Sequence, residues 1–328
     1  MQAATIIRDS DKQTTSQNTQ TTTAGTQAGN EGGPGYENST SNNTNSGNTQ
    51  SQVSAAAKAA ADAITKPEIT SEAGILYDVT NGRVLFEKNA DEKLAPASTT
   101  KLMTALLVLE KSKLDDKVTF SKTAVTNLES GAVKIGLVEG DQVSVKDCLY
   151  GLLLKSANEV ANGLAEHVSG SISAFADLMN ARAKELGCTN THFVTPNGLD
   201  SADAGGIHQT TARDLALIMS YAVKNKAFLH ITQTRDYSFS DISGKRQFSV
   251  HNANAFLDMT SDAISGKTGF TGNAGYCYVA ACENEERRFI ISLLGCGWPN
   301  NKTYKWKDAM KLLEYGKANF YKETYWQG

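Results

Sequence analysis

The chain lacks the features that mark several protein classes. Its 328 residues include five cysteines and five histidines. The cysteines show no C-x-x-C spacing and the histidines no metal-ligand spacing, so we expect no zinc site and no other metal site. The odd number of cysteines also argues against a disulfide framework. The spacing leaves a bridge between Cys282 and Cys296 open, and we expect most cysteines to be small core residues.

Strong net charge and long apolar runs are also missing. The net charge is −3 and the pI is about 6.0, which gives no electrostatic basis for binding nucleic acid. No run of 18 or more apolar residues is available to span a membrane. Residues 1–8 do not have the pattern of a signal peptide. We therefore expect any membrane contact to come through a tether or anchor that is not present in this chain.

Large apolar side chains are nearly absent from residues 9–54, which are mostly Thr, Asn, Gln, Ser and Gly. Such a segment cannot offset the entropy of ordering by burying surface. We therefore expect residues 1–66 to form a disordered linker. Residues 67–328 carry most of the apolar side chains and are long enough to build a sizeable core, so we expect them to form the folded domain.

Strand patterns lie near both ends of this domain, and helical patterns lie between them. Residues 74–79 and 83–87 flank Asn81-Gly82, for which we expect a hairpin with a type I′ turn. A second strand pair covers residues 275–282 and 288–294. Helical patterns cover residues 98–113, 145–154, 159–168, 172–186, 211–225 and 305–320. This order predicts an α+β fold, with an antiparallel sheet built from both ends of the domain and a helical region inserted.

The most informative stretch begins the first of these helices, at Ser98-Thr99-Thr100-Lys101. Residues three apart share a helix face, so the Lys101 amine can reach the Ser98 hydroxyl. The helix that follows is apolar almost all round, which predicts a buried, dry setting for Lys101. A desolvated lysine can serve as the base that activates a serine nucleophile. Alone, however, this pattern is more often a capping serine beside a solvated lysine.

Two later motifs change that balance. Ser156-Ala157-Asn158 lies at a junction between helical patterns, and Lys267-Thr268-Gly269 precedes the last strand pair. With these three motifs in this order, the chain resembles the penicillin-recognising serine acyl-transferases. Residues 190–200, 208–216 and 266–276 further resemble the low-molecular-mass D-alanyl-D-alanine carboxypeptidases of serine peptidase family S11. The resemblance covers nearly all of residues 67–328.

The resemblance implies a β-lactamase/transpeptidase-like fold and a role for each matching residue. Ser98 would attack the carbonyl of the penultimate D-alanine, with Lys101 as its base. Ser156 would relay a proton toward the leaving amine. Asn158 would hydrogen-bond Lys101 and the substrate amide, and Lys267 would keep the pocket electropositive beside Ser156.

The same resemblance implies the substrate-binding residues Thr268, Gly269 and Phe270. Thr268 would bind the terminal carboxylate of the substrate. The backbone N–H groups of Ser98 and Phe270 would form the oxyanion hole, which needs two donors aimed at the developing charge. The expected partners are peptidoglycan stem peptides and, as covalent inhibitors, β-lactam antibiotics. The reaction would use no cofactor, and the protein would act outside the cytoplasm, secreted or tethered to the outer face of a bacterial cytoplasmic membrane.

Two other functions remain open. Class A β-lactamases share the three motifs but add an E-x-x-L-N loop. The glutamates between Asn158 and Lys267 are Glu159, Glu166 and Glu185, and none begins that pattern, which argues against fast penicillin hydrolysis. A catalytically silent peptidoglycan-binding module is the second alternative, although every motif residue is intact.

Four further residues have weaker assignments. We expect His208 to be a structural polar residue and Asp214 to cap the start of a helix. The family often uses a late basic residue to hold the substrate carboxylate. The sequence leaves open whether Lys302, Lys305 or neither has that role.

Overall fold

The computed structural model describes residues 65–126 and 128–320. The expected linker over residues 1–66 lies outside the described residues except for its last two positions. In chain order the elements are β1 (Ala73–Asp78), β2 (Arg83–Lys88), η2 (Ala97–Thr100), α2 (Lys101–Lys111), β3 (Lys117–Thr119), α3 (Lys122–Thr126), β4 (Gln142–Ser144), α4 (Val145–Tyr150), η3 (Gly151–Lys155), α5 (Asn158–Ser169), α6 (Ile172–Glu185), β5 (Ala202–Asp203), β6 (Gly206–Ile207), α7 (Ala212–Ala222), α8 (Lys226–Gln233), β7 (Asp236–Ser240), β8 (Gln247–His251), α9 (Phe256–Met259), β9 (Ala263–Thr271), β10 (Gly275–Asn284), β11 (Arg287–Leu294), η4 (Pro299–Asn301) and α10 (Tyr304–Phe320).

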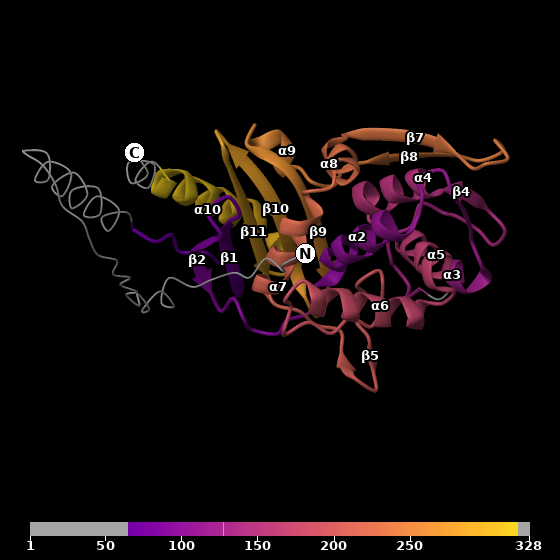
Figure 1. The fold of residues 1–328 in the computed structure, drawn as a ribbon, viewed down its shortest axis with the longest axis horizontal. Coiled ribbons are helices and arrows are strands. Elements are labelled where there is room, and N and C mark those ends of the chain that lie inside the picture. Colours follow the sequence, from indigo (N-terminus) through magenta and orange to yellow (C-terminus); the bar gives the residue numbers. More distant parts are fainter. Residues whose placement is uncertain (1–64, 127, 321–328) are drawn as a thin grey trace, which may run out of the picture.

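One five-stranded antiparallel sheet organises the domain, in the order β2-β1-β11-β10-β9. Its strands come from the two ends of the described chain, as predicted, and the helices between them form the inserted region (Figure 1). The sequence analysis predicted four of the five strands and missed β9. The reason is that β9 reads Ala-Ile-Ser-Gly-Lys-Thr-Gly-Phe-Thr, in which two glycines and a lysine interrupt the apolar pattern typical of a buried strand.

Both faces of the sheet are covered, and β11 shows this most clearly. Ile290 and Leu294 belong to the core on one face, together with α2, α7 and α8. Phe289, Ile291 and Leu293 alternate with them and belong to the core on the other face, where α10 packs. Side chains of a strand alternate between faces, so a strand with apolar side chains on both faces must be covered on both sides. Figure 1 shows α10 and α7 on opposite sides of the sheet.

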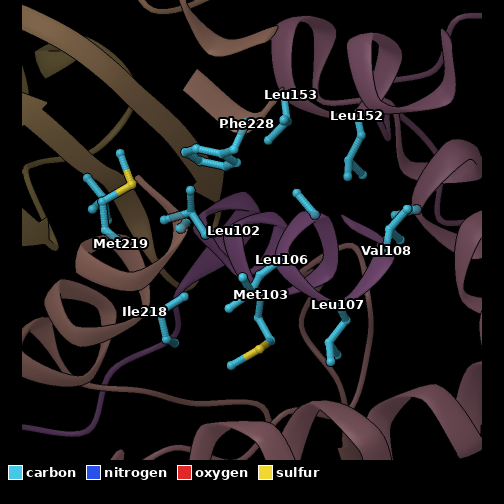
Figure 2. Packing of buried hydrophobic residues seen from close by; sticks show 14 of the residues in the cluster. Leu102, Met103, Leu106, Leu107, Val108, Leu152, Leu153, Ile218, Met219 and Phe228 are labelled. Carbon is cyan, nitrogen blue, oxygen red and sulfur yellow. The ribbon is translucent and has the colours of Figure 1, made fainter. Parts of the chain in front are cut away.

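Helix α2 is the buried centre of the inserted region. Leu102, Met103, Leu106 and their neighbours pack against side chains from η3, α7 and α8, which surround the helix in Figure 2. Each fully buried leucine contributes about 1.5–3 kcal/mol of transfer free energy. The predicted burial of this helix is confirmed, and it places the first turn of α2 deep inside the domain.

The predicted type I′ turn at Asn81-Gly82 is wrong. Asp78 pairs with Arg83, so four residues connect β1 to β2. Gly82 has a positive φ of 66°, but Asn81 does not, whereas a type I′ turn needs both. The physical reason is local: the Asp78 carboxylate accepts hydrogen bonds from the backbone and side-chain amides of Asn81, which closes the wider loop.

Other differences concern the ends of helices and the cysteines. The predicted helix over 145–154 is present, but its second half, η3, is a π-helix. Asp214 is not the cap of α7: the Thr211 side chain accepts from the Asp214 N–H, while the Asp214 carboxylate accepts from the Asn190 N–H and the Thr191 hydroxyl. All five cysteines are buried and free, so the bridge between Cys282 and Cys296 is not formed. The β7–β8 hairpin and α8 were not predicted.

Candidate active site

Ser98 lies in the turn η2, directly before α2, and this turn is wedged between two backbone segments. Ala97, the residue before it, has a φ of 48° and is fully buried. A Cβ at Gly198 would lie 1.9 Å from the Ala97 carbonyl oxygen. A Cβ at Gly269 of β9 would lie 2.8 Å from the Ser98 nitrogen. Two glycines therefore allow the chain to approach the serine turn from both sides.

The Lys101 amine lies directly behind the Ser98 hydroxyl. Its Nζ is 2.8 Å from Ser98 Oγ, 2.7 Å from Asn158 Oδ1 and 2.5 Å from the Asn197 carbonyl oxygen. The side chain is 0% exposed. Burial lowers the pKa of Lys101 well below its ordinary value, the nearby Lys267 lowers it further, and Glu159 raises it. A lysine whose pKa is lowered in this way gives up its proton more readily, and the neutral amine can accept one from Ser98.

A second lysine–serine pair faces the same space. Ser156 follows η3 and adopts a left-handed conformation with φ 69°, which turns its hydroxyl out of the helical path. Backbone strain of this kind costs about 1–3 kcal/mol and is concentrated at functional sites. Lys267 Nζ of β9 is 2.9 Å from Ser156 Oγ and 2.7 Å from the Thr268 carbonyl oxygen. Burial lowers the pKa of Lys267 to about 7.

Asn158 joins the two sides of the site. It begins α5, and while its Oδ1 accepts from Lys101, its Nδ2 donates to the Val133 carbonyl at 3.1 Å. The backbone N–H of Asn158 donates to the same carbonyl at 2.9 Å. The orientation of the amide is therefore fixed, and one Nδ2 hydrogen remains to face the open space.

That open space is a cleft of about 560 Å³. Its lining includes residues 129–133 and residues 268–273, which belong to β9 and the turn after it. Six of the eight predicted site residues line it: Ser98, Ser156, Asn158, Thr268, Gly269 and Phe270. The other two, Lys101 and Lys267, lie just behind it, hydrogen-bonded to its serines. The structure therefore brings together every residue of the three motifs.

Of the two late lysines, Lys305 lines this cleft and Lys302 does not. Lys305 is buried, with its Nζ 4.5 Å from the ring centroids of both Tyr276 and Trp306, and it donates to the Lys302 carbonyl oxygen. Burial lowers its pKa. Lys302 is exposed. A cation held between two rings at the cleft is placed to meet an anionic group of a ligand.

His208 lies behind the serine turn and not in the cleft. Its Nδ1 accepts from the Val194 N–H at 2.9 Å, so its Nε2 carries the proton that it donates to Thr100 Oγ1, at 2.8 Å. Burial lowers the pKa of His208 to about 3, which keeps the ring neutral. These contacts give it the structural setting that the sequence analysis expected.

Two residues at the site were missed as participants. Asn197 contributes only a backbone carbonyl to Lys101, and a carbonyl leaves no trace in the residue type. The sequence Pro196-Asn197-Gly198 predicts a tight loop, but it does not predict which residue that loop contacts. Glu159 was considered only as a β-lactamase glutamate, yet it is fully buried at the start of α5.

No group of three or more His, Cys, Asp or Glu side chains within residues 65–126 and 128–320 could hold a metal ion. Over the same residues, no helix combines the length and the apolar character that crossing a membrane requires.

Comparisons with known proteins agree with this geometry. A family model of D-alanyl-D-alanine carboxypeptidases, the S11 peptidases, matches residues 58–297. The chain is 32% identical over 255 residues to the D-alanyl-D-alanine carboxypeptidase DacF of Bacillus subtilis, covering 76% of this chain and 63% of DacF. It is 37% identical over 269 residues to the D-alanyl-D-alanine carboxypeptidase DacC of Escherichia coli, covering 77% of this chain and 62% of DacC. The chain thus spans less than two thirds of the length of these two relatives.

Among solved structures, the Streptomyces K15 DD-transpeptidase matches with a TM-score of 0.71 at 33% identity. The match covers 78% of this chain and 100% of that protein. The predicted fold class, an α+β fold of the β-lactamase/transpeptidase type, is confirmed by this similarity and by the antiparallel sheet.

Proposed function

Because the chain belongs to the D-alanyl-D-alanine carboxypeptidase family of serine peptidases, we propose that it removes the terminal D-alanine from the pentapeptide stems of peptidoglycan. The reaction would pass through an acyl-enzyme on Ser98, and β-lactams would acylate the same serine. The observation that carries the proposal is the contact, at 2.8 Å, between the buried Lys101 amine and the hydroxyl of Ser98, which lines the cleft.

Acylation begins with a proton transfer. Neutral Lys101 takes the proton of Ser98 as Oγ attacks the carbonyl carbon of the penultimate D-alanine. The carbonyl oxygen becomes negative, and the N–H groups of Ser98 and Phe270 are the proposed donors to it. Phe270 lies on β9, the edge strand of the sheet, whose outer side carries no strand pairing within the described residues. The close approach of Gly269 to the Ser98 nitrogen supports this arrangement, because it brings the two backbones together.

Collapse of this intermediate breaks the peptide bond and releases D-alanine, whose amine must gain a proton. The proton is the one that Lys101 took from Ser98, and Ser156 is the proposed relay that passes it to the amine, since its hydroxyl lies in the same cleft and is held by Lys267. A water molecule then attacks the ester carbonyl and gives a proton to Lys101, which is neutral again. Ser98 leaves as its hydroxyl, which regains a proton from Lys101, and the shortened stem is released.

The substrate ends in a carboxylate, and the end of the cleft near β9 suits an anion. Thr268 offers a half-buried hydroxyl there, with the Lys267 amine hydrogen-bonded to its carbonyl oxygen. Lys305 lines the same cleft between two rings, and we propose it over Lys302 as the additional cation for that carboxylate. Asn158 would donate its remaining amide hydrogen to the substrate backbone.

The location follows from the substrate. Peptidoglycan stems are processed outside the cytoplasm, so we infer that the protein works there, at the cell wall. The domain proposed to carry the activity is residues 67–328. Tethering to the outer face of the membrane would require a segment beyond those described.

Intact mass after mixing with benzylpenicillin tests the proposal, together with D-alanine release from a pentapeptide. We expect one adduct, on Ser98, that decays slowly, and we expect release of one D-alanine per peptide. Ser98→Ala should form no adduct and release no D-alanine while keeping its melting temperature. Ser249→Ala, on the exposed face of β8, is the matched control and should behave as wild type.

The alternatives give different results in the same experiment. Rapid loss of the drug without a lasting adduct would identify a β-lactamase. Neither an adduct nor drug loss would leave a silent binding module. Near wild-type D-alanine release by Ser98→Ala would overturn the assignment of the nucleophile.

A further inference from the structure

Glu159 is a buried carboxylate beside the catalytic groups that none of the proposed steps uses. It follows Asn158 directly in the first turn of α5 and is 0% exposed. Carboxylates are rarely fully buried without partners, because the loss of hydration is costly. We therefore expect the buried Glu159 carboxylate to have hydrogen-bond partners and to act on neighbouring charged groups.

One oxygen of Glu159 binds the backbone of residues 133–136, which we call the 133–136 wall and which continues from the cleft-lining residues 129–133. Its Oε1 accepts from the backbone N–H groups of Ile135 and Gly136, at 2.7 and 2.9 Å. The preceding residue, Asn158, binds the Val133 carbonyl through both its backbone and its side chain. Two consecutive residues of α5, Asn158 and Glu159, thus form hydrogen bonds with residues 133–136. Residues 129–133, which line the cleft, continue directly into this segment.

A residue outside α5, Arg246, also binds this segment. Arg246 donates to the Gly136 carbonyl oxygen at 2.6 Å and pairs with Asp141. Gly136 has a φ of 90°, a conformation that favours glycine. The N–H of Gly136 is bound by Glu159 and its carbonyl by Arg246, so both backbone polar groups of this residue are held.

The second oxygen, Oε2, is buried without a hydrogen-bond partner among the described residues. A neutral glutamine oxygen would satisfy the two amides equally well, so the clamp alone does not require a charge. The charge acts on the lysines instead. Among the described residues, the hydrogen-bond acceptors of Lys101 are all neutral, namely Ser98, Asn158 and Asn197. The charged groups that act on Lys101 are Lys267, from β9, and Glu159, from α5; His208 behind it is neutral.

We propose that Glu159 is a positioning residue of the catalytic centre, which holds the 133–136 wall against Asn158 and supplies the negative charge that opposes Lys267 at Lys101. The proposal rests on the proposed function, in which Lys101 is the base. Glu159 touches neither substrate nor nucleophile, and it acts through Asn158, the wall and the field at Lys101.

The charge has a signature that a structural role would not produce. The acid limb of the pH profile for acylation reports the pKa of the free enzyme's base. Glu159 raises the pKa of Lys101, so removing its charge lowers that pKa further. The acid limb should then move to lower pH.

The experiment measures the second-order rate constant of acylation by benzylpenicillin from pH 4 to 9, in three variants of the full chain. Glu159→Gln keeps an oxygen for the Ile135 and Gly136 amides and removes the charge. Glu159→Ala removes both. Glu166→Gln, on the same helix with its carboxylate bound by Ser121, is the matched control.

We expect Glu159→Gln to melt near the wild-type temperature with its acid limb moved to lower pH, and Glu166→Gln to keep the wild-type limb. We expect Glu159→Ala to acylate about tenfold or more slowly at pH 7, with faster hydrogen exchange at residues 133–136. If Glu159→Ala does not fold, Glu159→Gln decides. An acid limb in Glu159→Gln that coincides with wild type would overturn the proposal. Absence of acylation in the wild type would instead overturn the proposed function.

Discussion

Two buried lysines at one site are the feature that matters most at the scale of single residues. Lys101 and Lys267 are both almost fully buried, and no carboxylate is hydrogen-bonded to either within the described chain. Two ammonium groups in one dry site repel each other, so one of them is favoured as the neutral amine. The site can therefore hold a base and a cation side by side, each hydrogen-bonded to its own serine.

This pairing predicts an alkaline limit to acylation. In the proposed mechanism Lys267 supports Ser156 as an ammonium. Burial lowers the pKa of Lys267 to about 7, so the charged form is lost as the pH rises through that value. We expect the acylation rate constant of the wild type to fall above about pH 7. In Lys267→Arg the guanidinium stays charged, so the maximum rate should be lower but the alkaline fall should disappear. The measurement is the pH profile of benzylpenicillin acylation.

Lys184→Arg, on the exposed side of α6, is the control and should retain the alkaline fall. A wild-type profile that stays level from pH 7 to 10 would contradict the assignment of a required ammonium to Lys267.

The motif residues could be predicted from sequence, because their chemistry lies in the side-chain type and their order is distinctive. Asn197 could not, because it acts through a carbonyl that every residue has. Glu159 could not either, because its role depends on two amides, Ile135 and Gly136, that only the folded chain brings to it.

At the scale of elements, the serine turn η2 depends on the loop that ends at Gly198. This glycine has a φ of 83°, and any Cβ there would meet the Ala97 carbonyl. We expect Gly198→Ala to push η2 away from the loop, to break the contact between Lys101 and the Asn197 carbonyl, and to slow acylation about 100-fold. Melting temperature and the acylation rate with benzylpenicillin measure both effects.

Gly187→Ala separates the clash from the backbone strain. Gly187 has a φ of 86° but no atom within 4 Å of a built Cβ, so this variant carries only the cost of the left-handed conformation, about 1–2 kcal/mol. Equal acylation rates in the two variants would show that the Gly198 contact is not needed to hold the nucleophile.

The elements themselves were predictable to different degrees. Helical patterns predicted α5, α6, α7 and α10 closely, because each has an apolar face that repeats with the helical period. Strand β9 was missed because its buried position 267 is a lysine serving the site instead of an apolar core residue. The turn after β1 was mispredicted because Asp78, outside the Asn-Gly pair, determines the loop.

At the scale of the whole molecule, the five buried thiols predict a loss of stability at alkaline pH. Burial raises the pKa of each: Cys148, Cys188, Cys277, Cys282 and Cys296. An unfolded thiol ionises above its ordinary pKa of 9.0, while the folded one stays neutral. Stability is therefore full below pH 9 and falls above it, by about 1.4 kcal/mol per thiol for each pH unit.

Three buried lysines, Lys101, Lys267 and Lys305, have the opposite sign, since their lowered pKa values favour the folded state as the pH rises toward 10.5. Five thiols outweigh three lysines, so the urea midpoint should fall between pH 9 and 10.5. Thiol labelling should accompany unfolding and not precede it. A midpoint that is unchanged at pH 10.5 would contradict this balance.

The pairing of β1 with β11 has a consequence for how the protein is made. Ala73 pairs with Leu294, so the first strand of the domain stays without this neighbour until synthesis has passed the last one. The strand that carries Lys267, Thr268 and Gly269 also emerges late, long after Ser98. Chains grow at about 5–20 residues per second, so roughly ten seconds or more pass between the synthesis of Ser98 and the synthesis of Lys267. Until then the chain lacks the Lys267 amine that holds the Ser156 hydroxyl and the Gly269 backbone that lies against Ser98.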